Sequence, residues 1–521
     1  MIMAKNIANI INFVRAADFR VDARELLDTY LQELELARSY PLHCTFLLQY
    51  DALAKPEYTA PLLDSAGDSR IEVGVWLELC REIVERAGIE WRGRPGCDWD
   101  WHVEPDMLMA YTPDERYRLI DLIMEKFREV FGCLPKSVGS WLIDSRSVEY
   151  MSEKYGLDAV CVCKEQYGTD GYTLWGGYYN QGYYPSKRNM FLPAQTKAEQ
   201  VATPIFKMLG PDPIYQYDDG FDEHYNPSAL QHVMTLEPTW GCGANPDWVD
   251  WYFDTIYQNE SLEFAYCQTG QENSFTWKNI APGLKMQYEK LMALVNAGKI
   301  EVMKLCDTGK WFKSKFASTP PTAMSALSDW KGEGRQSVWY DCKSYRVNWY
   351  REDGRLGIRD MFGFDENYTE RYYDTPSHGN TADYDALPLL DGYRWSGNDI
   401  RAMLAFTDSA GRLLDGSITS SENIDGRLRL AFDLDGHTAE ALMGETGIDV
   451  DAGAVGVELR MNVNSYADTT LSQTDVVTIK YSHNGASYFL RADGATLILG
   501  EMSLRIIPDG TRFSIKFESR G

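Results

Sequence analysis

The chain has 521 residues, of which 44% are hydrophobic and 25% charged, and its mean hydropathy is -0.38. This composition excludes a disordered or collagen-like chain, and the length indicates two or three domains. The 51 Lys and Arg against 77 Asp and Glu give a formal net charge of -26, which would repel a nucleic-acid backbone or an anionic lipid surface. We therefore expect a folded protein that does not bind nucleic acid.

No run of apolar residues approaches the ~20 needed to span a membrane. Residues 1–16 are typical of a strand and lack the features of a signal peptide. The ten Cys lie at or before Cys342, mostly in apolar runs and without a CxxC pair, which predicts buried free thiols. We expect a cytoplasmic protein as numbered, or a periplasmic or secreted one if a leader was removed before this numbering.

Residues 6–320 alternate between short apolar runs and longer amphipathic segments. The runs predicted as strands are residues 6–16, 44–53, 71–79, 137–144, 157–166, 203–210, 262–272 and 300–307. The segments predicted as helices include residues 22–40, 80–88, 112–132, 145–156, 245–259 and 281–298. This alternation favours a distorted (β/α)7–8 barrel over an open doubly wound sheet, which has no GxGxxG loop to support it.

After Pro320 and Pro321 the pattern changes to short alternating runs without long helices. Residues 336–361 contain a hairpin signal at Glu-Asp-Gly, and later runs are separated by Gly, Asp and Asn. We predict a catalytic barrel at 1–320, a β-rich linking segment at 321–400 and a C-terminal β-sandwich at 401–521.

Six of the predicted strands finish in an acid. The carboxyl ends of barrel strands form the active-site face, so these six carboxylates are expected to converge on one mouth of the barrel. Strand alternation places Trp76 beside Glu78, and Gln49 beside Asp51. The six acids are Asp51, Glu78, Asp144, Glu165, Glu272 and Asp307.

Some of these acids have a simpler interpretation. Asp144 precedes a predicted helix and is equally well read as its N-cap, and Asp307 before Thr-Gly is more typical of a turn. Glu78 and Glu272 are stronger candidates because Glu is a poor cap. Asp51, Asp144 and Glu165 remain further catalytic candidates.

Paired carboxylates are what glycosidic cleavage requires, since one protonates the leaving oxygen and the other attacks or activates water. We assign Glu272 as a catalytic carboxylate, with Gln271 beside it to bond a sugar hydroxyl and Gly270 to permit a tight bend. Glu78, next to Trp76, is predicted to be the acid with the raised pKa.

Residues 97–106 interleave acids, a histidine and tryptophans. A sugar-binding loop is expected, in which Trp99 and Trp101 stack on sugar rings and Asp100 or His102 bonds hydroxyls; a purely structural aromatic loop is the alternative. A divalent metal held by Asp51, Asp100 and His102 is a further alternative. The other predicted substrate-binding residues are Arg15, Gln49, Trp76, Trp141 and Gln271.

The runs NIINFVRA, FLLQYDAL, EVGVWLE, GIEWRGRPGCDWDWH and PKSVGSWLID resemble a family of glycoside hydrolases of bacterial polysaccharide degraders, similar in turn to polysaccharide deacetylases and family 57 glycoside hydrolases. The resemblance covers residues 6–320 and implies a seven-stranded β/α barrel with a β-sandwich behind it. It departs from the deacetylases where Trp76 stands in place of the first metal-binding His, and no HxxxH occurs.

We therefore expect a carbohydrate-active hydrolase that cleaves an oligo- or polysaccharide with two strand-end carboxylates and no cofactor. A metal-dependent polysaccharide deacetylase and a non-catalytic glycan-binding protein are the alternatives.

Overall fold

The computed structural model describes residues 4–65, 67–218, 234–239 and 242–519. Its first part is the predicted barrel, a nearly closed sheet in which β1 pairs with β9, β10 and β2 and the order continues β2-β3-β4-β5-β8-β7. All pairs are parallel except that of β7 with β8. The strands are β1 (Lys5–Val14), β2 (Cys44–Leu48), β3 (Ile71–Trp76), β4 (Ser137–Gly139), β5 (Ala159–Val162), β7 (Gly182–Tyr183), β8 (Ile205–Lys207), β9 (Phe264–Thr269) and β10 (Glu301–Met303).

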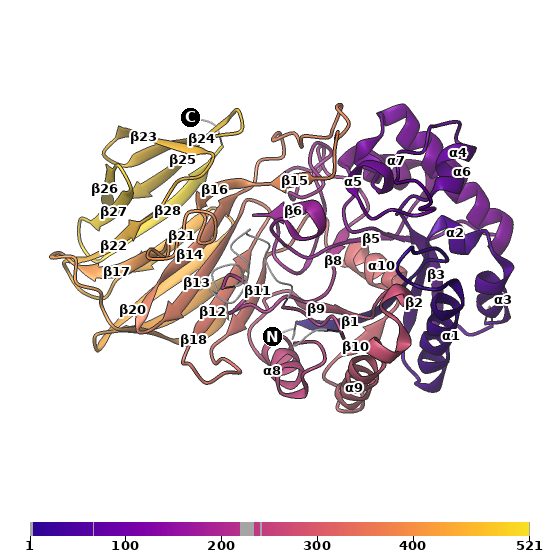
Figure 1. Cartoon of the computed structure of the whole chain (residues 1–521). Coiled ribbons are helices and arrows are strands. Elements are labelled where there is room, and N and C mark those ends of the chain that lie inside the picture. The colour runs from indigo at the N-terminus through magenta and orange to yellow at the C-terminus, as the bar shows by residue number, and fades with distance from the viewer. Residues whose placement is uncertain (1–3, 66, 219–233, 240–241, 520–521) are drawn as a thin grey trace.

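Helices cover the outside of this barrel (Figure 1). They are α1 (Ala23–Ser39), α2 (Tyr50–Leu53), α3 (Pro56–Asp64), α4 (Arg81–Arg86), α5 (Val103–Asp106), α6 (Pro113–Phe131), α7 (Ser145–Tyr155), α8 (Pro246–Gln258), α9 (Trp277–Asn296) and α10 (Leu305–Lys315). The predicted α6 begins at a capping box of Thr112 and Glu115 and ends at Gly132, whose φ of 73° is left-handed. None of the described helices is long and apolar enough to cross a membrane.

All eight predicted barrel strands end earlier than expected. β4 stops at Gly139, and β10 stops at Met303 because α10 begins at Leu305. Two backbone N–H groups in the first turn of α10 donate hydrogen bonds to side chains of neighbouring strands. Leu305 N donates to Thr45 Oγ1 at 3.0 Å, and Cys306 N donates to Glu72 Oε2 at 3.0 Å. Asp307 therefore lies in a helix and not at a strand end.

The second part consists of two antiparallel sheets. The first has the order β11-β12-β13-β14-β17-β22-β27-β26, with β16 also paired to β14, and the second has the order β18-β19-β20-β21-β28-β25-β24-β23. The first contains β11 (Thr322–Ala326), β12 (Gln336–Asp341), β13 (Tyr345–Glu352), β14 (Arg355–Gly363), β16 (Leu387–Leu390), β17 (Leu404–Asp408), β22 (Val457–Asn462), β26 (Ala495–Gly500) and β27 (Ser503–Pro508). The second contains β18 (Gly416–Ile424), β19 (Arg427–Leu434), β20 (His437–Gly444), β21 (Gly447–Asp451), β23 (Thr469–Asp475), β24 (Thr478–His483), β25 (Ala486–Asp493) and β28 (Arg512–Glu518).

The two sheets share one hydrophobic core. Trp349 of β13 packs against Phe406 of β17 and against Phe432 of β19, with ring centroids 6.0 and 5.0 Å away. The predicted hairpin joins β13 to β14 through Asp353 and Gly354, which both have positive φ. All ten Cys are free thiols, as predicted, and eight are buried.

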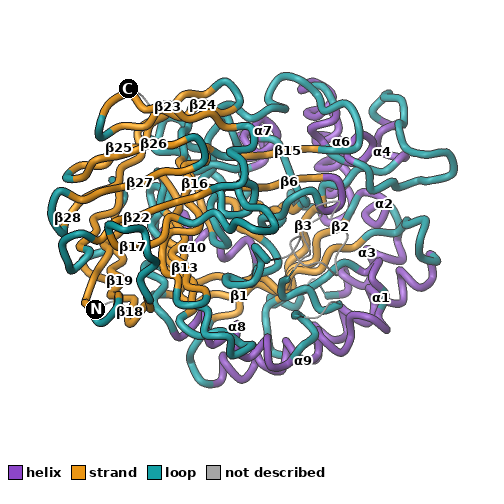
Figure 2. Tube along the Cα trace, turned by 60° about the vertical axis from the view of Figure 1, so that its left-hand side comes forward, coloured by secondary structure: helices purple, strands orange, loops and turns teal. Residues whose placement is uncertain are grey.

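The sandwich sheets and the barrel helices lie on opposite sides of the molecule (Figures 1 and 2). Between them β6 (Tyr172–Trp175), from the barrel half of the chain, pairs in parallel with β15 (Ala382–Asp385). A buried ion cluster also joins the halves, because Arg346 of β13 pairs with Glu165 and with Asp360.

Candidate active site

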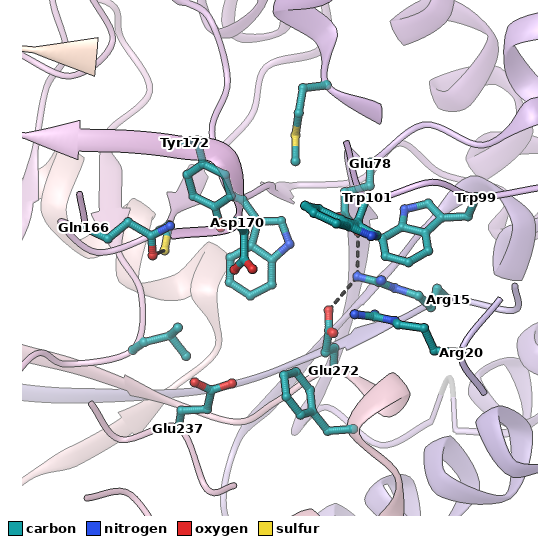
Figure 3. Close-up of a pocket in the computed structure, with 15 residues that line it drawn as sticks. Arg15, Arg20, Glu78, Trp99, Trp101, Gln166, Asp170, Tyr172, Glu237 and Glu272 are labelled. Carbon is teal, nitrogen blue, oxygen red and sulfur yellow. Dashed lines mark hydrogen bonds and ion pairs between the residues drawn. The ribbon is translucent and has the colours of Figure 1, made fainter. Parts of the chain in front are cut away.

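A cavity of about 390 Å³ lies at the carboxyl ends of the barrel strands (Figure 3). Its lining side chains follow different strands: Arg15 comes after β1, Glu78 after β3, Trp141 after β4, Cys163 after β5 and Glu272 after β9. Arg20, Trp99, Trp101, Met107, Gln166, Asp170, Tyr172, Leu209, Glu237 and Phe275 complete the wall. This is the face on which barrel enzymes place their active sites.

Arg15 joins the two glutamates that the sequence singled out. Its Nη2 lies 2.7 Å from Glu78 Oε2 and 2.5 Å from Glu272 Oε2. The Trp99 ring packs against the guanidinium, with its centroid 3.9 Å from Cζ. Arg15 is thus fixed on three sides, and its positive charge stabilises both carboxylates.

Glu78 is bonded by Arg15 and by Trp76, and its pKa is raised, as predicted. Trp76 Nε1 donates to Glu78 Oε2 at 2.8 Å, which confirms that the two side chains share a strand face. Burial raises the pKa of Glu78, and Arg15 is the main influence that lowers it. Burial and the neighbouring Glu78 also raise the pKa of Asp106 far above its usual value. Glu78 therefore also helps to position Arg15.

Glu272 has a second carboxylate beside it that sequence reasoning missed, Glu237. Gln271 links them, because its Nε2 donates to Glu237 Oε1 at 2.7 Å while its Oε1 accepts from Glu272 N at 2.8 Å. Ser274 Oγ donates to Glu272 Oε1 at 2.5 Å. Burial raises the pKa of Glu237 to about 7, and the charges of Glu272 and Asp170 act in the same direction.

Gly270 sets this arrangement, as expected. Its φ is 107°, and a Cβ at this position would lie 1.9 Å from Ile11 O. Only glycine allows the chain to turn so close to β1 and bring Gln271 and Glu272 to the barrel mouth.

Aromatic rings line the cavity or pack behind its wall, and the predicted binding residue Trp76 is among those behind it. Trp76 stacks on Phe13 with centroids 4.2 Å apart and meets Trp141 edge-on at 5.2 Å. Trp101 stacks on His102 at 4.2 Å. Trp101 and Trp141 are partly exposed and line the cavity, so both offer ring faces to a ligand.

The other three catalytic candidates lie outside the cavity wall. Asp51 lies in α2 and accepts from Ala16 N at 3.0 Å and Ala52 N at 2.7 Å, and burial raises its pKa to about 6. Asp144 is the N-cap of α7 and pairs with Arg116 at 2.9 Å. Glu165 points to the sandwich, where it pairs with Arg346 and accepts from Gly177 N at 3.0 Å.

Two residues of the alternative metal site, Asp100 and His102, bond to each other, while Asp51 accepts from other groups. Asp100 accepts from Arg94 and from His102 Nδ1, the latter at 2.7 Å; burial would raise the pKa of Asp100, but these bonds lower it to about 2. Within the described ranges no three His, Cys, Asp or Glu side chains are gathered as a ligand set, so Asp51, Asp100 and His102 do not form one. Gln49 lies at the start of α2 with its side chain buried.

Two of the missed residues had only weak sequence signals. Glu237 lies in the segment between β8 and α8, where no strand pattern predicts a position at the barrel mouth. Asp170 has a φ of 55°, and the flanking Gly168 and Gly171 were the one hint of a turn that could present it.

No family model and no curated protein matches the sequence. Among solved structures, a putative glycoside hydrolase/deacetylase from Parabacteroides distasonis aligns with a TM-score of 0.59 and 12% identity, over 76% of this chain and 93% of that one. A putative polysaccharide deacetylase from Mycobacterium smegmatis aligns with a TM-score of 0.36 and 10% identity, over 60% and 91%. A GH57-type branching enzyme from Pyrococcus horikoshii has a TM-score of 0.34 and 10% identity, over 60% and 71%. The P. distasonis match confirms the predicted resemblance at the level of fold.

Proposed function

We propose that the protein is a glycoside hydrolase in which Glu237 is the general acid and Glu272 is the nucleophile or general base. The observation that carries this proposal is the pair itself: two carboxylates on one cavity wall, joined by Gln271 but placed in different environments. The P. distasonis protein of the same fold, described as a putative glycoside hydrolase/deacetylase, is compatible with this proposal and with the deacetylase alternative.

The environments match the two roles. Glycosidic cleavage needs one protonated and one ionised carboxylate. Glu237 is only 7% exposed, and burial outweighs the nearby charge of Lys164, so it holds its proton up to about pH 7. Glu272 is bonded by the Arg15 guanidinium and by the Ser274 hydroxyl, so it lies beside a cation where Glu237 does not.

The cavity also suits a sugar. Trp101 and Trp141 can stack on the apolar faces of sugar rings, while Gln166 and the acids can bond hydroxyls. At about 390 Å³ it is at the small end of the ~300–1,000 Å³ typical of small-ligand sites, so it holds one or two rings of a longer substrate.

The test is the release of new reducing ends from a panel of oligosaccharides and aryl glycosides. Glu237→Gln and Glu272→Gln should each lower turnover by roughly 100-fold or more, with little change in thermal stability. The loss in Glu237→Gln should shrink on aryl glycosides with a good leaving group, which need no protonation, whereas the loss in Glu272→Gln should not. The exposed Glu90→Gln is the matched control and should keep full activity.

The pH profile gives a second readout. Because the general acid must be protonated, turnover should fall as the pH rises through about 7, the pKa of Glu237. Release of acetate in place of new reducing ends, or full activity in both active-site variants, would refute the proposal.

A further inference from the structure

The cavity contains more negative than positive charge. Arg15 meets three carboxylates, since its Nη1 also lies 3.6 Å from Asp18 in addition to the contacts with Glu78 and Glu272. Arg20, the other cation of the wall, is held by the same Asp18, with Nε and Nη2 at 2.9 and 2.6 Å from its two oxygens. Both guanidinium groups are therefore already neutralised by protein carboxylates.

Asp170 is an acid that no guanidinium bonds, although the charge of Arg20 acts on it. Asp170 lies in the cavity wall, and among the described residues its carboxylate has no hydrogen bond and no ion pair. Its backbone is left-handed, with a φ of 55°, a conformation that few residue types adopt readily. Asp and Asn tolerate this conformation best. The turn from Gly168 to Gly171 thus presents a free carboxylate to the cavity.

Glu237 provides a second, independent observation. It is more than nine-tenths buried, it lines the cavity, and only its Oε1 is bonded, to Gln271, in the described part of the chain. Figure 3 shows the carboxylates of Asp170, Glu237 and Glu272 around one space. The charge of Asp170 acts on Glu237, as expected for neighbours on one wall.

The arrangement of the carboxyl groups of Asp170, Glu237 and Glu272 suits an organic cation better than a metal ion. A metal needs three or more ligands converging within ~2 to 2.6 Å of one point, and the described residues contain no such group. An ammonium group attached to a sugar ring needs only one or two carboxylate contacts, and the ring itself can lie against Trp101 or Trp141.

We propose that this cavity selects a sugar that carries a free, positively charged amino group, and that Asp170 binds the ammonium. The inference rests on the proposed glycosidase function and specifies the substrate class of the same site. It also predicts rejection of uronic acids, whose carboxylate would face Asp170 and Glu272.

The test is direct binding, measured by calorimetry at pH 6.5, of glucosamine, galactosamine and mannosamine against their neutral parent hexoses, N-acetylglucosamine and glucuronate. At least one amino sugar should bind about five- to tenfold more tightly than its parent, and the advantage should decrease as salt is raised. Asp170→Asn should remove most of this advantage and change binding of the neutral hexose less than about twofold.

Asp425→Asn is the matched control, because Asp425 is an exposed aspartate with φ 52° in a turn of the sandwich. It should leave the preference unchanged. Equal affinity for amino and neutral sugars, tighter binding of glucuronate, or an unchanged preference in Asp170→Asn would each overturn the inference. Binding can be measured without turnover, so the two proposals can fail separately. A preference for amino sugars without release of new reducing ends would refute only the hydrolase proposal. Turnover without a preference for amino sugars would refute only the amino-sugar proposal.

Discussion

Replacing Arg15 with methionine tests the electrostatic core of the site. Arg15 is 2% exposed and bonds Glu78 and Glu272 at 2.7 and 2.5 Å, so the substitution leaves both carboxylates without their cation. Breaking a buried ion pair by removing one partner costs about 3–5 kcal/mol. We expect a loss of about 3 kcal/mol in the free energy of unfolding at pH 8, because the carboxylates can relieve part of the penalty by taking up protons.

The pH dependence follows from the same carboxylates. Burial already raises the pKa of Glu78 and Arg15 is what mainly lowers it, so without Arg15 that pKa rises further above its unfolded value. A carboxyl with a raised folded-state pKa loses stability as the pH rises through that range. The difference between the wild type and Arg15→Met should therefore shrink to about 1 kcal/mol at pH 5.

The assay is denaturant unfolding of both proteins at pH 5 and pH 8. Arg20→Met is the control, since the Arg20 side chain is 48% exposed and pairs only with Asp18 among the described residues; it should cost less than about 1 kcal/mol at either pH. An equal loss for Arg15→Met at both pH values would refute the argument that the buried carboxylates depend on this cation.

Two further substitutions separate binding from structure. Trp101→Ala should weaken glycan binding about five- to tenfold with little effect on the melting temperature. Trp99→Ala should cost about 3 kcal/mol of stability, because that ring is 2% exposed and packs on Arg15. Equal melting temperatures of the two variants would contradict this. Glu165→Gln should lose about 2 kcal/mol of stability, measured by denaturant unfolding, and keep wild-type turnover, because Glu165 pairs with Arg346 outside the cavity. A variant of normal stability without turnover would show that Glu165 is a catalytic residue.

The sequence was sufficient for features that depend on neighbours along the chain. The alternation of apolar runs and amphipathic segments predicted the barrel, and strand periodicity put Trp76 and Glu78 on one face, where they form a hydrogen bond. Gly270 could be recognised as the bend that exposes Gln271 and Glu272, because a positive φ is a local property of glycine.

Only the tertiary structure decided which acids meet. Asp144 and Glu165 follow barrel strands just as Glu272 does, yet the first caps α7 and the second pairs with Arg346, which is 181 residues away in the chain. Glu237 and Asp170 have no strand pattern, yet both line the cavity from positions outside the barrel strands. Periodicity fixes the direction of a side chain within its own strand or helix, whereas charge pairing and burial depend on segments far apart in the sequence, so the composition of the site follows from packing and not from local pattern.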